Sequence, residues 1–163
     1  MILFRFIARL PLPILYVLSD FLFLLSYHIV RYRRPLVKRN LVRSFPEKSK
    51  SEILSIQREY YHNLCDYAVE TLKLLTIDQS DLAKRVVFKN GYVLEKYKSQ
   101  NQSVLLLASH QFNWEWLLAS GNFNLPVAID FVYQPIQNKI VNQFLLACRT
   151  RFSTCNQTQR ACP

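Results

Sequence analysis

Five consecutive apolar residues, Val104 to Ala108, constrain the fold of this chain more than any other feature of its sequence. The run has no polar alternation and stops at Ser109, which is typical of a strand buried on both faces of an α/β sheet. The amphipathic stretch from Trp114 to Leu118 predicts a helix shortly after it. Ligands bind where such strands give way to helices, so we expect the functional site at this edge.

His110 and Glu115 are the acid–base candidates at this edge. A histidine with a pKa near neutrality can take a proton from an alcohol if a carboxylate fixes its tautomer and stabilises the imidazolium. The pair works only if His110 lies in the turn before the helix. The alternative is that His110 caps the helix and Glu115 is a solvated acid favoured by the helix dipole. The spacing alone does not choose between these readings.

The surrounding residues carry a resemblance to a known family. His110 and Glu115, within ASHQFNWEWLL, resemble the His-x4-Asp/Glu motif of the glycerolipid acyltransferases, specifically the bacterial lipid A biosynthesis acyltransferases. The likeness runs from the first residues to about Phe152. It includes further elements in the family's order: Arg39-Asn40-Leu41, Phe45-Pro46-Glu47, Tyr133-Gln134-Pro135, Asn138, Arg149 and Arg151.

The resemblance implies a membrane-anchoring helix followed by an α/β acyltransferase domain. His110 would act as general base on a lipid hydroxyl, and Glu115 would orient it. Acyl carrier protein or coenzyme A would supply the acyl thioester as co-substrate, so no further cofactor is expected, and neither is a metal. The acceptor would be a lipid A precursor or a related lysophospholipid. The substrate-binding candidates are Arg149 and Arg151, for the phosphorylated acceptor, together with Asn113 and Tyr133.

The apolar segment from Leu10 to Val30 predicts a membrane helix. Its 21 residues match the roughly 20 that cross the hydrocarbon core. Two arginines precede it and six basic residues follow it, which predicts that the body faces the cytoplasm, and the resemblance implies that the membrane is a bacterial inner membrane. A cleaved signal peptide is one alternative. A helix in the membrane surface is another, because Asp20 lies in the middle of the segment and is costly in lipid.

The basic residues cluster directly after this segment. The chain has 21 Lys and Arg against 11 Asp and Glu, a formal net charge of +10, which indicates an anionic partner. We expect attraction to lipid head groups and no nucleic acid, although a basic nucleic-acid-binding protein remains the alternative. The membrane-surface candidates are Arg31, Arg33, Arg34, Lys38 and Arg39.

The remaining pattern divides the chain into an anchor at 1–30, a basic segment at 31–48, an α/β domain at 49–152 and a polar tail at 153–163. Ser49 or Ser51 offers an N-cap for a long amphipathic helix to about Ile77. We expect short helices after Asp78 and Gly91, strands at Val86–Phe88 and Val127–Tyr133, and a helix at Asn138–Cys148. His62 and Asp66 are four residues apart, but an ordinary polar helix face explains them better than a metal site.

The tail matches nothing in the family, and the family's later acidic motif has no counterpart here. We therefore expect a truncated or frame-shifted product, and a catalytically inactive membrane-bound remnant is the alternative function. The four cysteines include no C-x2-C pair, which argues against a redox or metal motif.

Overall fold

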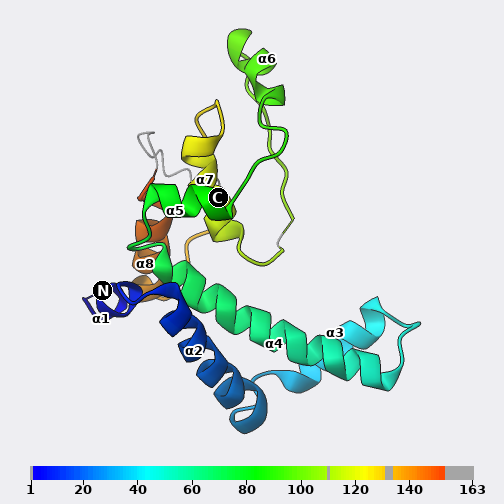
Figure 1. Ribbon diagram of the computed structural model, residues 1–163. Coiled ribbons are helices and arrows are strands. Elements are labelled where there is room, and N and C mark those ends of the chain that lie inside the picture. Colours follow the sequence, from blue (N-terminus) through cyan, green and yellow to red (C-terminus); the bar gives the residue numbers. More distant parts are fainter. Residues whose placement is uncertain (1, 110, 131–133, 153–163) are drawn as a thin grey trace. The chain divides into compact units, whose positions relative to one another are not determined.

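The structure is a computed structural model, and it describes residues 2–109, 111–130 and 134–152. All regular secondary structure in these ranges is helical (Figure 1). The elements are α1 (Ile2–Ala8), α2 (Leu12–Phe23), the π-helix η1 (Leu24–Ile29), α3 (Arg34–Ser44), α4 (Lys50–Lys73), α5 (Gln79–Arg85), α6 (Val93–Ser99), α7 (Trp114–Asn124) and α8 (Lys139–Thr150). The chain forms two compact units, which we call the first unit (Leu10–Glu70) and the second unit (Met1–Arg9 with Thr71–Pro163).

The first unit begins with the predicted apolar helix. Pro11 and Pro13 lie at the start of α2, where proline is compatible with the first helical turn. The segment Leu12–Ile29, with a mean hydropathy of 1.6, is long and apolar enough to cross a membrane by length and composition. It ends in a tight turn in which Arg31 and Arg33 adopt left-handed backbone angles, with φ of 54° and 51°.

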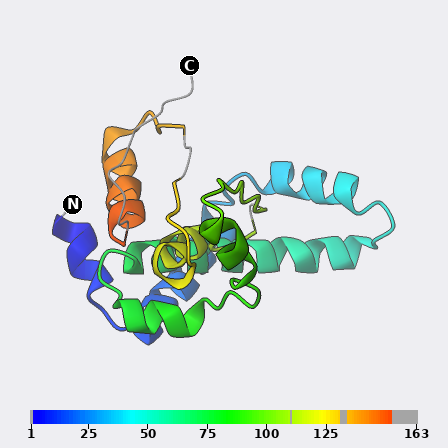
Figure 2. The same cartoon turned by 90° about the horizontal axis from the view of Figure 1, so that it is seen from above.

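Aromatic side chains form the core of the first unit. Phe23 and Tyr27 from the apolar segment pack with Tyr61 and Cys65 of α4. The Tyr61 hydroxyl donates to the Tyr32 carbonyl. The α3 helix runs side by side with α4 (Figure 2), and the side chain of α4 residue Gln57 donates to the Arg34 carbonyl at 2.8 Å.

The long helix α4 starts at the predicted cap. The Ser49 hydroxyl accepts from the Glu52 backbone N–H at 3.3 Å, and the Glu52 carboxylate accepts from the Ser49 N–H at 2.8 Å, which is a capping box. The Ser49 hydroxyl also donates to the Glu52 carboxylate at 2.7 Å, and this bond, followed by the one from the Ser49 N–H, lowers the pKa of Glu52. The helix ends at Lys73 rather than at Ile77, because the chain turns through i→i+3 hydrogen bonds such as Thr76 N–H to Lys73 carbonyl at 2.9 Å.

In the second unit, α7 packs against α8 and α5 packs against α7. The predicted helices after Asp78, Gly91 and Asn138 are confirmed as α5, α6 and α8. Asn138 caps α8 by accepting from the N–H groups of Ile140 and Val141 at 3.0 and 3.2 Å. Long coil segments lead to and from α6 (Figure 1).

The predicted strands are wrong wherever the structure describes them. Val104–Ala108 is coil with exposed side chains, 83% for Leu105 and 88% for Leu107. Val86–Phe88 and residues 127–130 are also coil, and residues 131–133 lie outside the described ranges. A strand needs a neighbouring backbone to satisfy its N–H and C=O groups, and the described residues contain no such ladder. The α/β class is therefore not confirmed, and the described chain is helical.

Candidate active site

Glu115 lies in the first turn of α7, and the local sequence explains why the helix begins there. Asn113 adopts a left-handed conformation with φ of 66°, which asparagine tolerates better than most residues. Its side-chain oxygen accepts from the Trp116 N–H at 3.2 Å. The position at the helix N-terminus favours a negative charge. The Glu115 side chain is nevertheless only 1% exposed, so it is not the solvated acid of the alternative reading.

Arg149, in the last turn of α8, holds this buried carboxylate. Its Nε donates to Glu115 Oε2 at 2.8 Å, and its Nη2 donates to Oε1 at 2.5 Å. This two-point contact uses both carboxylate oxygens and fixes the plane of the group. The arginine also sits at a helix C-terminus, where a cation is favoured. The pair therefore joins two helix ends of complementary partial charge.

Two predicted site residues, His110 and Tyr133, lie outside the described residues. Arg151 follows α8 and donates from Nη1 to the Leu74 carbonyl at 2.6 Å. Burial lowers the pKa of its guanidinium, and the nearby Asp78 opposes that shift. Arg151 thus binds the turn after α4, whereas Arg149 binds Glu115. The two arginines predicted to bind the acceptor therefore contact different parts of the second unit and do not converge on one point.

An apolar cavity of about 760 Å³ adjoins the start of α7. Its wall contains the exposed coil Val104–Ser109 and one side of α7, including Trp114, Leu118 and Gly121. Ser109 and Trp114 both line the cavity, and they flank His110 in the sequence. The apolar run predicted to be a buried strand therefore faces an open cavity of the size that ligand sites have.

A family sequence comparison decides what kind of protein carries this arrangement. The model of the bacterial lipid A biosynthesis acyltransferases matches residues 1–155. The chain belongs to this family. No curated protein and no solved structure matches it.

Membership makes the chain an acyltransferase of the lipid A biosynthesis type, as the motif around His110 and Glu115 predicted. The family is bacterial and membrane-associated. Its general substrates are a lipid acceptor and an acyl thioester donor.

In this lipid A acyltransferase family member, sequence reasoning missed the partner of Glu115. The two residues are 34 positions apart, and no local spacing links them. The sequence offers only a weak signal for this contact. The helix dipole favours an acid in the first turn of a helix and a base in the last turn, but this preference does not indicate that the two residues meet.

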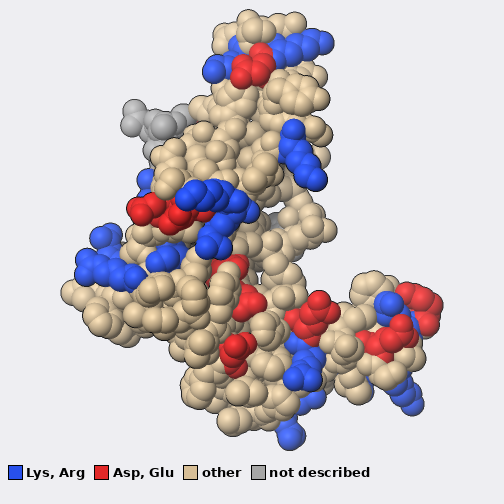
Figure 3. All heavy atoms as spheres, in the orientation of Figure 1, with Lys and Arg blue, Asp and Glu red and all other residues tan. Residues whose placement is uncertain are grey.

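The basic cluster lies in the first unit, on the turn before α3 and on α3 itself. Arg34 is anchored there, because its guanidinium stacks 4.2 Å from the Tyr27 ring centroid and donates to the Tyr27 carbonyl at 3.3 Å. The other four predicted surface residues are exposed: Arg31, Arg33, Lys38 and Arg39. On the face drawn in Figure 3, lysine and arginine side chains lie over several parts of the chain, with acidic side chains among them.

Proposed function

We propose that this protein transfers a fatty acyl group from a thioester donor to a hydroxyl of a lipid A precursor or a related lysophospholipid. The donor would be acyl carrier protein or coenzyme A, and the reaction would take place on the cytoplasmic side of the inner membrane. One observation carries the proposal. Glu115, which lies five residues after His110 in this family's motif, is buried, and Arg149 holds its carboxylate at two points.

The chemistry assigns each group a role. His110 removes the proton from the acceptor hydroxyl, and the alkoxide oxygen attacks the thioester carbonyl. The carbon–sulfur bond breaks, and the leaving thiolate takes the proton back from the imidazolium. Glu115 orients the imidazole and balances its positive charge. Arg149 acts through Glu115 by fixing the plane of the carboxylate, which a single-point contact would leave free to rotate.

The contacts of the arginines change the expected division of labour at the acceptor. Arg149 is engaged by Glu115, so we assign it to positioning rather than to the acceptor phosphate. Arg151 remains our candidate for the phosphorylated acceptor, with Asn113 and Tyr133 as polar neighbours. Recognition of phosphate by arginine would use the same fork of donors that Arg149 gives to Glu115.

The cavity beside α7 supports the identity of the group that is transferred. Its wall is dominated by aliphatic and aromatic side chains from Val104–Ala108 and from α7. An acyl chain would bury its methylene groups there, and burial of each one is worth about 0.8 kcal/mol. Ser109 and Trp114 line this cavity and lie one and four residues from His110 in the sequence, which supports His110 as the base that acts on a group bound there.

A transfer assay with the whole 163-residue chain in phospholipid vesicles tests this function. Radiolabelled acyl carrier protein thioester and acyl-coenzyme A would be offered with a lipid A precursor or a lysophospholipid. We expect His110→Ala to lower the rate by about 10²–10⁴-fold, as for loss of a general base. Glu115→Gln should lower it by about a hundredfold or more, because the neutral amide cannot stabilise the imidazolium.

Glu95 provides the matched control, because it is also a first-turn acid, on the exposed helix α6. Glu95→Gln should leave the rate unchanged. Absence of transfer with every donor and acceptor would favour the inactive remnant. Equal rates for the chain and for His110→Ala would overturn the assigned mechanism.

A further inference from the structure

The apolar segment α2–η1 carries a row of exposed apolar residues on its outward side, although Asp20 and His28 of the same segment are also exposed. The residues of this row follow helical spacing, and their exposed fractions range from 50% to 68%: Ile14, Val17, Phe21 and Leu24. Ile29 and Val30 extend the exposed apolar surface at the end of the segment. In Figure 3 the visible surface over α2 is largely uncharged. A row of this kind on a soluble surface needs a partner.

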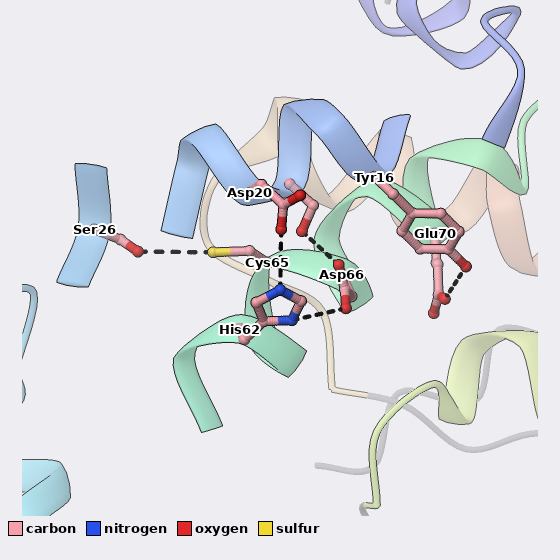
Figure 4. Close-up of polar contacts among 8 residues, drawn as sticks. Tyr16, Asp20, Ser26, His62, Cys65, Asp66 and Glu70 are labelled. Atoms are coloured by element: carbon pink, nitrogen blue, oxygen red, sulfur yellow. Dashed lines mark hydrogen bonds and ion pairs between the residues drawn. The ribbon is translucent and has the colours of Figure 1, made fainter. Parts of the chain in front are cut away.

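The side of the segment that faces α4 contains, beside the aromatic core, a row of polar side-chain contacts with α4 (Figure 4). The Tyr16 hydroxyl donates to Glu70 at 2.7 Å, and the Ser19 hydroxyl donates to Asp66 at 2.6 Å. Further along, Ser26 contacts the Cys65 sulfur at 3.7 Å. We call this row of contacts the polar seam. Because these contacts join the two helices, the orientation of α2 in a membrane also determines the orientation of α4.

His62 lies at the centre of the polar seam. Its Nε2 is 3.0 Å from an oxygen of Asp20, and its Nδ1 is 3.2 Å from an oxygen of Asp66. Both carboxylates keep contact with solvent, because the Asp20 side chain is 63% exposed and that of Asp66 is 25% exposed. A transmembrane orientation of α2 would carry these ionisable groups into the hydrocarbon core.

The composition of α4 makes a transmembrane orientation of α2 still more costly. Along the length that contacts α2, this helix presents a histidine and two acidic residues, and Arg58 and Glu59 lie one turn before them. Ionisable residues in a bilayer are expensive and need partners or water. Lying in the interface removes the difficulty, because the apolar face enters the lipid while the seam and α4 stay in water.

We propose that α2–η1 does not span the bilayer but docks on one leaflet of an anionic membrane, with the Ile14–Val17–Phe21–Leu24 face inserted and the polar seam turned toward water. The charge pattern identifies the lipid. Between residues 21 and 46 the chain has no acidic residue and six basic ones, so the cluster that follows the inserted face matches a negative head-group layer. The inference rests on the proposed membrane-bound function.

Labelling from the two sides of the membrane tests the topology. Arg9 and Lys38 are exposed residues on either side of the segment, and each would be changed to cysteine in a chain carrying Cys155→Ser and Cys162→Ser. The remaining thiols of Cys65 and Cys148 are buried and their pKa values are raised, which keeps the background low. Sealed right-side-out and inside-out vesicles would then be treated with a membrane-impermeant maleimide.

We expect both cysteines to react in the inside-out vesicles and neither in the right-side-out ones. Reaction of the two cysteines in opposite vesicle types would overturn the docking topology and establish a span. Reaction of both from the periplasmic side would keep one-leaflet docking but contradict the cytoplasmic placement in the proposed function. The assay does not depend on acyl transfer, so an inactive enzyme would not obscure its result.

Flotation of the purified chain with vesicles tests the inserted face and the lipid preference. Val17→Asp should lower the floated fraction by about tenfold, because a charge would have to enter the lipid. Leu54→Asp is the matched control, since Leu54 is an exposed apolar residue on α4, 42% exposed, and its change should leave flotation unaltered. Circular dichroism would check that both variants keep the helix content of the parent chain.

Vesicles with phosphatidylglycerol should bind the parent chain more strongly than vesicles of phosphatidylcholine alone, and added salt should remove the difference. Equal flotation of Val17→Asp and the parent chain would overturn the assignment of the inserted face. Equal binding to neutral and anionic vesicles would overturn the assignment of the lipid.

Discussion

Each unit of this protein contains a carboxylate held by a basic side chain, and the two arrangements differ in their exposure to water. In the second unit, Glu115 is 1% exposed and Arg149 meets it at two points, with a side chain only 16% exposed. In the first unit, His62 lies between Asp20 and Asp66, and all three keep contact with solvent. The buried pair has two defined hydrogen bonds, whereas the exposed group is one part of a longer seam.

The difference separates two uses of charge. A buried ion pair gives up hydration, and removal of one partner leaves an uncompensated charge in a medium of low dielectric constant. An exposed pair gains little, because water and salt already stabilise each charge. In the second unit the ion pair therefore fixes the Glu115 carboxylate in one orientation. In the first unit the ionisable groups keep contact with water beside an apolar helix.

The largest effect is expected from Arg149→Met. It leaves Glu115 buried without its cation and should lower the free energy of unfolding by about 3–5 kcal/mol. Both tryptophans of the chain, Trp114 and Trp116, lie in the second unit, so urea unfolding followed by tryptophan fluorescence reports on this unit.

The double variant with Glu115→Gln is the control, because it removes the charge that Arg149→Met leaves unpaired. Stability should be largely recovered, with a coupling of about 0.5–3 kcal/mol in the double-mutant cycle. If the effects of the two changes simply add, the ion pair does not stabilise the buried carboxylate.

The sequence predicted most helices of both units, because their signals are local, but it did not predict α3, which lies in the segment assigned only as basic. Ser49 with Glu52, and Asn138 ahead of α8, mark helix starts through hydrogen bonds that span two or three residues. The apolar stripe of α4 likewise follows from its own spacing. The contact between Glu115 and Arg149 depends on how α7 packs against α8, and no local pattern encodes that distance.

The strand prediction at Val104–Ala108 shows the opposite limit. An uninterrupted apolar run indicates a segment that avoids water, but it does not indicate the partner that provides the shelter. Here the described residues contain no neighbouring strand, and the run lines a cavity instead. The candidate site beside this run stays a prediction, whereas the sheet that should have carried it is absent from the described residues.

The next largest effect is the loss of stability at high pH that a buried thiol causes. One buried cysteine in each unit allows the units to be compared. Burial raises the pKa of Cys148, in the second unit, from 9.0 to about 12. Above the lower value the unfolded chain loses the proton while the folded chain keeps it, so stability falls as the pH rises through this window. The contribution of this group is a slope of about 1.4 kcal/mol per pH unit.

Cys148→Ala should lower stability at neutral pH, through loss of packing, and should flatten its decline at high pH. Fluorescence-monitored urea unfolding at a series of pH values would measure both. Cys65→Ala is the control, since Cys65 lies in the first unit and its substitution should leave the fluorescence-detected pH dependence unchanged. An unaltered slope in Cys148→Ala would show that the thiol does not ionise on unfolding.

Loss of a helix cap should lower stability less than the changes above, and by a similar amount in each unit. Asn138→Ala removes an acceptor for two backbone N–H groups at the start of α8, and Ser49→Ala removes half of the capping box of α4. Each change should lower stability by about 1 kcal/mol. Hydrogen–deuterium exchange should locate the faster exchange in the first turn of the affected helix. Uniform acceleration in both units would contradict a local role for the caps.

The smallest effect is expected from Asp66→Asn, which removes one of the two carboxylates that face His62. Because the pair is exposed, the loss should be no more than about 1 kcal/mol at low salt. Hydrogen–deuterium exchange of the first unit would measure it, since that unit contains no tryptophan.

Salt then separates the two arrangements. In about 1 M NaCl, where the screening length is near 3 Å, the effect of Asp66→Asn should vanish. The effect of Arg149→Met should persist, because ions do not reach the buried carboxylate of Glu115. A salt-resistant loss in Asp66→Asn would mean that the hydrogen bond from Ser19, at 2.6 Å, stabilises the seam more than the contact with His62 does. In that case Ser19→Ala should reproduce the loss, and the seam would resemble the second unit more closely than its exposure suggests.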